Sequence, residues 1–540
     1  MSGVPRPMPV ARARPTLWRW LASLSAGFAL AITAPAQAVT VKIATAFDPQ
    51  TMDPHALALL YHSRIAFQVH ESLLNRDEQF RIEPSLALSW NQVDAKTWRF
   101  KLRQGVVFHD GSPFTVDDAV FSIQRAMTPP SQRAFQLKGV TGAQKVDEQT
   151  LEVDLEAPDA VLPEKFLNLP MMSKAWAQLH KVEVAQDFNG KQETFAVRNA
   201  DGTGPYMLDR YEPDIRTVLK KNPRWWGWSE KRSGNVDEIV WLAIRSDATR
   251  LAALISGEVD MVLDPPIPDV TRLKSEPALT VLQTADLGEQ YLVFDVARDE
   301  LEGSDVKGRN PFKDLRVRRA VYQSINVDLI AQKVLRGLAV PTGAWLSPRV
   351  DGSLAELDKR LAYDPVKARA LLAEAGYPNG FSVTMDCVNV AWREAVCQAM
   401  TAMLTQVGIR ASLRSSPTNQ FFPKLTSGTT SLAEFGWNPT TDAWVSLNAM
   451  FHSYDRAGFG TFNAGRYSNV KLDVLIDAMR VEADATRRRA MVATVLRLVG
   501  EELPSVPLYR RTLNWAMKKN LRAVIWPNDT PELRWLRVQP

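Results

Sequence analysis

Short β-rich runs alternate with amphipathic helical runs along most of the chain. Residues 41–46 and 98–102 have the length and the β-branched or aromatic content of strands, and residues 56–74 have helical spacing. Thr115 stands where a helix N-cap is expected, and the two aspartates that follow it suit the positive end of a helix running to Met127. This alternation predicts an α/β protein.

The alternation continues through the rest of the sequence. Further strands are predicted at residues 206–211, 217–221, 239–244, 260–263 and 381–386, and further helices at residues 248–256, 315–325 and 394–406. A chain of 540 residues is too long for one ordinary core, because single domains usually stop growing at about 250 to 300 residues. Two or three domains are therefore expected.

The first 38 residues have a different pattern, that of a secretory signal peptide. Arg6, Arg12, Arg14 and Arg19 stand in a segment without acidic residues, and the apolar stretch 20–33 follows. Residues 36–38 read Ala-Gln-Ala, which predicts cleavage after Ala38. The alternative is an uncleaved anchor, but the apolar stretch is shorter than the roughly 20 residues that span a bilayer. No cysteine follows the cleavage site, so a free, soluble periplasmic protein is predicted.

Removing this segment takes away four arginines and no acid, which lowers the formal net charge from +5 to +1. A nearly neutral mature chain gives no electrostatic case for nucleic acid or an anionic membrane as partner. The only cysteines, Cys387 and Cys397, are placed by export in an oxidising compartment. One ends a predicted strand and the other lies early in a predicted helix, which favours a disulfide, with two reduced buried thiols as the alternative.

Several segments, read together, form a pattern that spans nearly the whole mature chain. They are ESLL (71–74), IEPSLALSW (82–90), TWRFKLRQGVVFHDGSPFTVDDAVFSIQRA (97–126), GTGPYMLDRYEP (202–213), KNPRWWG (221–227), NPFKDLRVRRAVYQSIN (310–326), YDPVKARALLAEAGYPNGF (363–381), GRYSN (465–469) and LPSVPLY (503–509). In content and order they resemble the family 5 extracellular solute-binding proteins, the peptide and nickel receptors of bacterial ATP-binding-cassette importers. Independently of the family name, the residues of these segments have physical interpretations: His109 is expected to be a hydrogen-bonded structural residue, and Arg316, Arg318 and Arg319 are expected to be solvated or ion-paired.

The resemblance implies a three-domain fold of the type II periplasmic-binding-protein kind. Residues 39–74, 200–286 and 508–540 would form domain I, the first lobe; residues 75–199 the extra domain II; and residues 287–507 domain III, the second lobe. Domains I and III would close over a ligand by a hinge motion. The implied partners are a small-molecule or oligopeptide ligand and the permease subunits of the importer, with the receptor itself a monomer.

The resemblance also implies where the ligand is bound. Three segments would line the cleft, residues 59–63, 388–393 and 434–444. The residues carried over are Tyr61, His62, Asn389, Trp392, Arg393, Trp437, Asn438, Thr440 and Asp442, with Phe462, Asn463 and Arg466 as weaker candidates. Arginine suits a carboxylate, tryptophan an apolar wall and asparagine an amide group.

One position departs from the pattern of the peptide receptors. They usually carry an aspartate three residues after the tryptophan, where it neutralises the peptide's ammonium group, and this chain has Thr440 there. A buried ammonium without a partner is costly, so either Asp442 substitutes or the ligand has no free α-amino group at this place.

Other functions are weaker readings of the same sequence. An exported hydrolase lacks support, because no GxSxG elbow is present and the HESLL segment at His70 fails the HExxH zinc pattern. The glycines at 202 and 204 lack the third glycine of a dinucleotide fingerprint, so no cofactor is expected. His55, His62 and His70 lie near one another in sequence, so a receptor for a metal chelate remains an alternative. A receptor for a small organic acid is a further alternative. No catalytic residue and no protein-bound metal are predicted.

Overall fold

The computed structural model describes residues 38–229, 233–455 and 459–540. Residues 39–540 form one compact unit. The predicted signal peptide falls almost wholly outside the described residues. Among the helices of the described residues, none combines the length and the apolar character that a membrane span requires.

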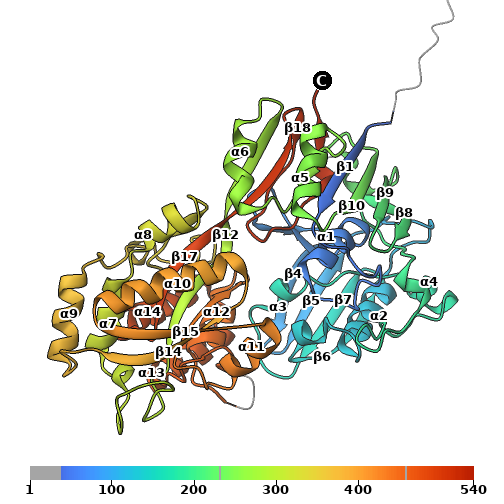
Figure 1. The fold of residues 1–540 in the computed structure, drawn as a ribbon. Helices are drawn as coiled ribbons and strands as arrows, with labels where there is room; N and C mark the ends of the chain where they lie inside the picture. Colours follow the sequence, from blue (N-terminus) through green and yellow to red (C-terminus); the bar gives the residue numbers. More distant parts are fainter. Residues whose placement is uncertain (1–37, 230–232, 456–458) are drawn as a thin grey trace, which may run out of the picture. The chain divides into compact units, whose positions relative to one another are not determined.

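In the described ranges, eleven strands form one mixed sheet (Figure 1). Its order is β15 (Ile409–Ser416), β14 (Phe381–Val388), β16 (Leu432–Trp437), β12 (Leu279–Phe294), β17 (Ser505–Lys518), β11 (Met261–Val262), β1 (Thr40–Thr45), β10 (Glu238–Ala243), β9 (Arg216–Lys221) and β8 (Tyr206–Glu212), with β13 (Ala339–Pro341) paired to β17. The pairs β1–β10, β1–β11, β14–β15 and β14–β16 are parallel. The predicted α/β class is confirmed.

The strands β12 and β17 connect the two halves of this sheet, and Figure 1 shows them side by side. They pair antiparallel from Leu279 opposite Lys518 to Val293 opposite Ser505. The register is interrupted between Ala285 and Glu289, where the ladder skips residues 286–288. Such a bulge weakens the pairing and bends the strand locally.

A second, antiparallel sheet has the order β4 (Ala87–Asp94), β5 (Thr97–Leu102), β7 (Thr150–Leu155) and β6 (Val140–Asp147). Helix α2 (Val116–Met127) packs on β6 and β7. Its start follows the sequence prediction, because the Asp118 carboxylate accepts hydrogen bonds from both the backbone N–H (2.9 Å) and the hydroxyl (2.7 Å) of Thr115.

Helices cover the β14–β15–β16 end of the large sheet (Figure 1). They are α7 (Leu315–Ser324), α9 (Pro365–Glu374), α10 (Ala391–Gln406), α12 (Ala443–Phe451), α13 (Val470–Val481) and α14 (Ala485–Glu502). The other elements are α1 (Leu60–Val69), β2 (Leu74–Arg76), β3 (Ile82–Pro84), α3 (Leu162–Lys165), α4 (Lys174–Leu179), α5 (Asp247–Ser256), α6 (Val270–Ser275), α8 (Val327–Leu329), α11 (Thr418–Thr426), β18 (Leu521–Arg522) and β19 (Arg537–Val538).

The buried apolar side chains gather in separate clusters. One lies almost entirely between Leu287 and Trp526, a second between Leu73 and Met171, and two more combine residues of β1, the 206–279 region and the C-terminal strands. The chain therefore builds several cores that share one long sheet. The exact domain limits given above stay a prediction.

Two local expectations are corrected. The helix predicted at residues 56–74 is only Leu60–Val69, because the residues before it form a buried loop and the residues after it continue into β2. Arg318 is neither solvated nor ion-paired: it is 8% exposed and donates hydrogen bonds to the carbonyl oxygens of Phe312 (2.7 Å), Glu502 (2.6 Å) and Leu503 (3.0 Å). The last carbonyls of α14 have no partner within the helix and attract a cation.

Candidate ligand-binding site

The first predicted ligand segment forms the start of α1. Tyr61 is half-buried, its ring stacks on Phe47 with centroids 5.4 Å apart, and its hydroxyl accepts a hydrogen bond from Gln50 at 3.4 Å. His62 is 1% exposed, and its Nε2 is hydrogen-bonded to the carbonyl oxygen of Asp53 at 3.0 Å. Burial lowers the pKa of His62 to about 3, so the ring is neutral. This placement moves His62 from a direct ligand contact to a support for the segment.

The loop that His62 holds is fixed from the other side by a buried ion pair. The Arg125 guanidinium of α2 donates two hydrogen bonds to the Asp53 carboxylate, at 2.9 and 2.7 Å, and both side chains are fully buried. Burial alone would raise the pKa of Asp53, but the charge and hydrogen bonds of Arg125 outweigh it and hold this pKa well below its ordinary value. The pair ties the segment before α1 to the second sheet's helix.

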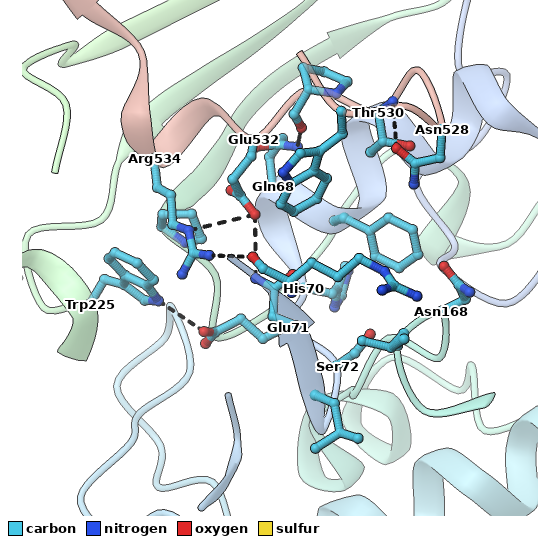
Figure 2. A pocket seen from close by; sticks show the side chains of 18 residues that line it. Gln68, His70, Glu71, Ser72, Asn168, Trp225, Asn528, Thr530, Glu532 and Arg534 are labelled. Carbon is cyan, nitrogen blue, oxygen red and sulfur yellow. Dashed lines mark hydrogen bonds and ion pairs between the residues drawn. The ribbon is translucent and has the colours of Figure 1, made fainter. Parts of the chain in front are cut away.

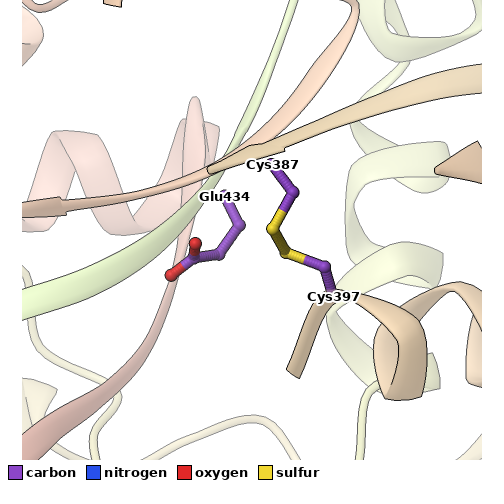
Figure 3. Close-up of side chains that lie close together, drawn as sticks. All are labelled: Cys387, Cys397 and Glu434. Carbon is purple, nitrogen blue, oxygen red and sulfur yellow. A yellow bond between two sulfur atoms is a disulfide. The ribbon is translucent and has the colours of Figure 1, made fainter. Parts of the chain in front are cut away.

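The second predicted segment, residues 388–393, is closed by a disulfide between Cys387 and Cys397. Cys387 is the penultimate residue of β14 and Cys397 lies in the second turn of α10. Figure 3 shows the Glu434 carboxylate beside the two sulfur atoms. The cross-link holds the first turn of α10, which carries Trp392 and Arg393, against the strand.

Arg393 is bound within the protein in this structure. It donates a hydrogen bond from Nη1 to Oε2 of Glu434 at 2.9 Å and one from Nη2 to Oε1 of Gln290 at 2.8 Å. Burial raises the pKa of Glu434, although Arg393 opposes this, and Oε1 of Glu434 has no hydrogen-bond partner among the described residues. The guanidinium therefore lies beside an acceptor with unused capacity.

A second arginine converges on the same place. Arg511 of β17 pairs with Asp286 of the β12 bulge at 2.6 Å, and its guanidinium lies 5.7 Å from the ring centroid of Trp392. Arg393 also lies over that ring, at 4.9 Å. The half-buried Trp392 thus contacts two cations, Arg393 of α10 and Arg511 of β17, while the nearby Asn389 is exposed.

The third predicted segment follows β16. Trp437 is half-buried, donates a hydrogen bond to the Ser446 hydroxyl at 2.9 Å, and packs on Phe462 with centroids 5.0 Å apart. Asn438 is exposed and touches the β12 bulge so closely that a Cβ on Gly288 would lie 2.0 Å from its Oδ1. This segment and the bulge are therefore in direct contact.

Two carboxylates next to Thr440, those of Asp442 and Glu164, have arginine partners, whereas the exposed Glu156 of the same cavity lining has no ion pair among the described residues. Asp442 caps α12 and forms a two-point ion pair with Arg488, so it is not free to replace the missing aspartate. Glu164 of α3 pairs with Arg76 at 3.0 Å and accepts a hydrogen bond from the Thr441 hydroxyl. A ligand ammonium group that bound Asp442 or Glu164 would therefore have to compete with an existing arginine.

A cavity of about 750 Å³ opens beside Thr440. Its lining comes from the second sheet's domain and from α12 and α13, and includes Phe135, Gln136, Lys165, Trp444, Asn448 and Arg480. In the described part of the chain, four buried polar atoms of these lining residues have no hydrogen-bond partner: Gln136 Oε1, Trp444 Nε1, Asn448 Oδ1 and Arg480 Nε. The volume is that of a small-molecule site, about 300 to 1,000 Å³.

A second, larger cavity of about 1,020 Å³ lies on the other side of Thr441. Two ion pairs lie within its lining, Arg76–Glu164 and Arg489–Asp351, and a third lining carboxylate, Asp442, pairs with Arg488 outside it. The cavity beside Thr440 is therefore the better candidate. Apart from Thr440, the sequence interpretation missed its lining, because the residues come from five separate stretches of the chain: 135–139, 156–168, 440–448, Phe459 and Arg480.

The weaker candidates have structural roles. Phe462 packs on Trp437, whereas Asn463 is buried and donates hydrogen bonds to the carbonyl oxygens of His452 (2.9 Å) and Tyr467 (2.7 Å). Arg466 has a φ of +52° and its guanidinium lies 3.8 Å from the ring centroid of Tyr454. Asn463 and Arg466 thus shape the turn before α13.

A smaller polar pocket lies where β2 leaves the large sheet's region (Figure 2). Its volume of about 50 Å³ is room for a few water molecules, well below that of a dipeptide. The indole N–H groups of Trp225 and Trp226 both donate to Oε1 of Glu71 at 3.1 Å. Burial raises the pKa of Glu71 to about 7. The hydrogen bonds in this pocket connect β2's neighbourhood to the Trp225–Trp226 segment, and the space left is too small for a peptide solute.

The histidines do not converge on a metal site. His55, His62 and His70 are buried and hydrogen-bonded to the carbonyl oxygens of Pro170, Asp53 and Met171. His109, as predicted, is a structural residue bonded to the carbonyl of Gly204 at 3.0 Å. Within the described ranges, the metal-like grouping is Cys387, Cys397 and Glu434, whose thiols are consumed in the disulfide.

Comparison with known proteins identifies the family of this chain. The family model described as "Bacterial extracellular solute-binding proteins, family 5 Middle" matches residues 81–458. The chain belongs to this family. Family 5 proteins are solute-binding proteins, and the predicted resemblance is confirmed.

Relatives match nearly the whole chain. The glutathione-binding protein GsiB of Escherichia coli (strain K12) is 26% identical over 512 residues, covering 93% of this chain and 94% of GsiB. Among solved structures of similar fold, HbpA2 from Haemophilus parasuis has a TM-score of 0.79 at 21% identity and covers 93% of this chain and 100% of its own. DppA from Helicobacter pylori, in complex with the peptide STSA, has a TM-score of 0.72 at 22% identity, with coverages of 93% and 98%.

Proposed function

We propose that this family 5 protein is the periplasmic receptor of an ATP-binding-cassette importer, and that it captures a short peptide or peptide-like solute and delivers it to the membrane permease. The cavity beside Thr440, with unsatisfied polar atoms in its lining, is the observation that carries this proposal. A matching relative binds glutathione, a tripeptide-like solute. The protein would act without transforming its ligand, as a monomer exported by a signal peptide cleaved after Ala38.

The ligand would bind between the cavity and the group formed by Trp392 and Arg393 of α10 and Trp437 at the end of β16. Filling such a site adds contacts to the closed arrangement that the open one lacks, and only that difference can shift the equilibrium between them. The bulge at residues 286–288 of β12, where the register with β17 shifts, would serve as the bending point. The permease would read the closed form.

Charge pairing around Thr440 favours solutes without a free ammonium group at that place. Asp442, Glu164 and Glu434 are each paired with an arginine, so no carboxylate of this set is available to a ligand amine. N-acylated peptides, or small organic acids as the second candidate, satisfy this condition. We expect Thr440→Asp to increase affinity for a free-amine dipeptide and to leave its N-acetyl form unimproved, as measured by calorimetric titration.

The receptor function is tested by native mass spectrometry of the protein purified from its own periplasm, followed by titration with glutathione, dipeptides and N-acetyl dipeptides. A retained small solute and a saturable rise in melting temperature are the expected results. Sustained hydrolysis of the added compounds would instead support the exported hydrolase. No bound solute and no response to any compound would contradict the proposal.

A further inference from the structure

Arg480, in the last turn of α13, is a cation of the Thr440 cavity without an acidic partner. Among the described residues, no carboxylate lies within ion-pairing distance of its guanidinium, and its Nε has no hydrogen-bond acceptor. The cations around it differ: Lys165 pairs with Asp159 at 2.9 Å, Arg488 with Asp442, and Arg487 with Glu482 at 2.8 Å. An unpaired, half-buried guanidinium has strong donor capacity left for an anion.

The position of Arg480 is fixed by its surroundings. Its carbonyl oxygen accepts a hydrogen bond from the backbone N–H of Ala160 at 3.1 Å, which joins α13 to the turn before α3. Its guanidinium lies 5.4 Å from the ring centroid of Trp444, and a Cβ on Gly139 would lie 3.6 Å from Nη2. The guanidinium is therefore held between an aromatic ring and a glycine, where little side-chain freedom is left to lose on binding.

The other lining groups supply complementary polar chemistry. Trp444 Nε1 is a donor without an acceptor, and Gln136 Oε1 and Asn448 Oδ1 are acceptors without donors. Trp444 and Asn448 are one turn apart on α12, and Gln136 comes from the facing domain. A solute with a carboxylate and adjacent amide or hydroxyl groups would satisfy these atoms together.

We propose that Arg480 is the residue that binds the solute's carboxylate, and that the receptor therefore selects acids of amide-bearing, peptide-like character over their uncharged analogues. The inference rests on the proposed function and names the solute class of the same cavity. Arg480 makes the charged contact, and the Trp444 indole forms the wall against which the guanidinium and the carboxylate lie. Gln136 and Asn448 orient the amide portion.

The test compares each acid with its own amide. The wild-type protein is titrated calorimetrically with glutathione, dipeptides and N-acetyl dipeptides, and the tightest-binding acid is then compared with its carboxamide. We expect the wild type to prefer the acid by roughly 10- to 100-fold, as for a hydrogen bond to a charged group. In Arg480→Gln this preference should fall to about one, with affinity for the carboxamide unchanged. Arg480→Lys should restore part of it.

Arg487→Gln is the matched control, since Arg487 is an exposed arginine of the next helix, paired with Glu482 outside the cavity. It should keep the wild-type preference, and circular dichroism should show all variants folded. A preference for the acid that survives in Arg480→Gln would overturn the inference while leaving the receptor function intact. A wild type that binds none of the compounds would refute the receptor function, and this inference with it.

Discussion

Replacing Arg125 by methionine should be the most destabilising change near the predicted ligand segments. Methionine keeps most of the side-chain volume of arginine and removes its charge. The Asp53 carboxylate, 0% exposed, would lose two hydrogen bonds of 2.9 and 2.7 Å and its ion pair with Arg125. It would retain the backbone N–H donors of His55 (3.0 Å) and Gln186 (3.0 Å).

The expected cost follows from the burial of the remaining charge. Breaking a buried ion pair by removing one partner costs about 3 to 5 kcal/mol, because the remaining ion stays desolvated without compensation. The two retained backbone donors place the expected loss of unfolding free energy near the lower end, about 3 kcal/mol. By contrast, Arg99→Met removes an ion pair whose arginine side chain is 44% exposed, and it should cost less than about 1 kcal/mol.

In Arg125→Met, the contribution of Asp53 to the unfolding free energy should depend on pH in the opposite direction to that in the wild type. In the wild type the pKa of Asp53 lies below its ordinary value, so the stabilisation is present above the unfolded pKa of about 4 and is lost as pH falls below it. Without Arg125, burial raises this pKa above the unfolded value. The variant is then destabilised most at neutral pH and recovers as pH falls towards about 4.

Urea unfolding at pH 4.5, 6 and 8 measures both effects, with Asp53→Asn/Arg125→Met as the second variant. The double variant should recover part of the loss and should be insensitive to pH at this site. A loss below 1 kcal/mol in Arg125→Met, or the same loss at all three pH values, would refute the reasoning. Ligand titration of the same variant should show weaker binding, since Asp53 holds His62 and the start of α1.

Three further changes have defined outcomes. Because the folded pKa of Glu71 is about 7, its ionisation destabilises the fold as pH rises from about 4.5 through 7. Glu71→Gln should therefore gain up to about 3 kcal/mol at pH 8 and no more than about 1 kcal/mol at pH 5; equal gains at both pH values would contradict this. Replacing both cysteines by alanine should lower the unfolding free energy by about 2.7 kcal/mol, the loop-entropy value for a separation of 10 residues, and reductant should then have no additional effect on urea unfolding. Gly288→Ala places a Cβ 2.0 Å from Oδ1 of Asn438 and should cost about 1 to 3 kcal/mol and weaken ligand binding in titration, whereas Gly142→Ala, with no atom within 4 Å, should do neither.

The sequence predicts the local elements well where a strong local signal exists. The capped helix after Thr115 begins at Val116 and ends at Met127 as expected, because Asp118 satisfies the N-cap. The predicted helix at 56–74 is too long, because buried contacts of Asp53 and the continuation into β2 override helical periodicity. Arg318 looks like a surface charge in sequence and is instead a cap for a helix end about 180 residues further along the chain.

Whether a site residue could be predicted from the sequence depends on how far away in the sequence its partners lie. The family resemblance locates Trp392 and Arg393, which lie in the first turn of α10, and Trp437, the last residue of β16, and the structure brings Arg393 to Glu434 on β16. Asp442 looks available in sequence but pairs with Arg488, 46 residues away. The cavity residue Arg480 has no sequence signal, since its distinguishing property is the absence of an acidic neighbour among the described residues, which only the folded arrangement reveals.

The bulge in β12 is the proposed bending point and contacts the candidate site. The sequence could not show it, because it depends on pairing with β17, more than 200 residues away. Three contacts converge there: Asp286 holds Arg511, Arg511 lies over Trp392, and Gly288 packs against Asn438. A solute that contacts Trp392 or Asn438 would therefore act on the backbone at the proposed bending point. We infer that ligand contact and closure share these residues, so Gly288→Ala should change both the affinity and the compaction seen by solution scattering. A change in affinity with unaltered ligand-induced compaction would separate the two.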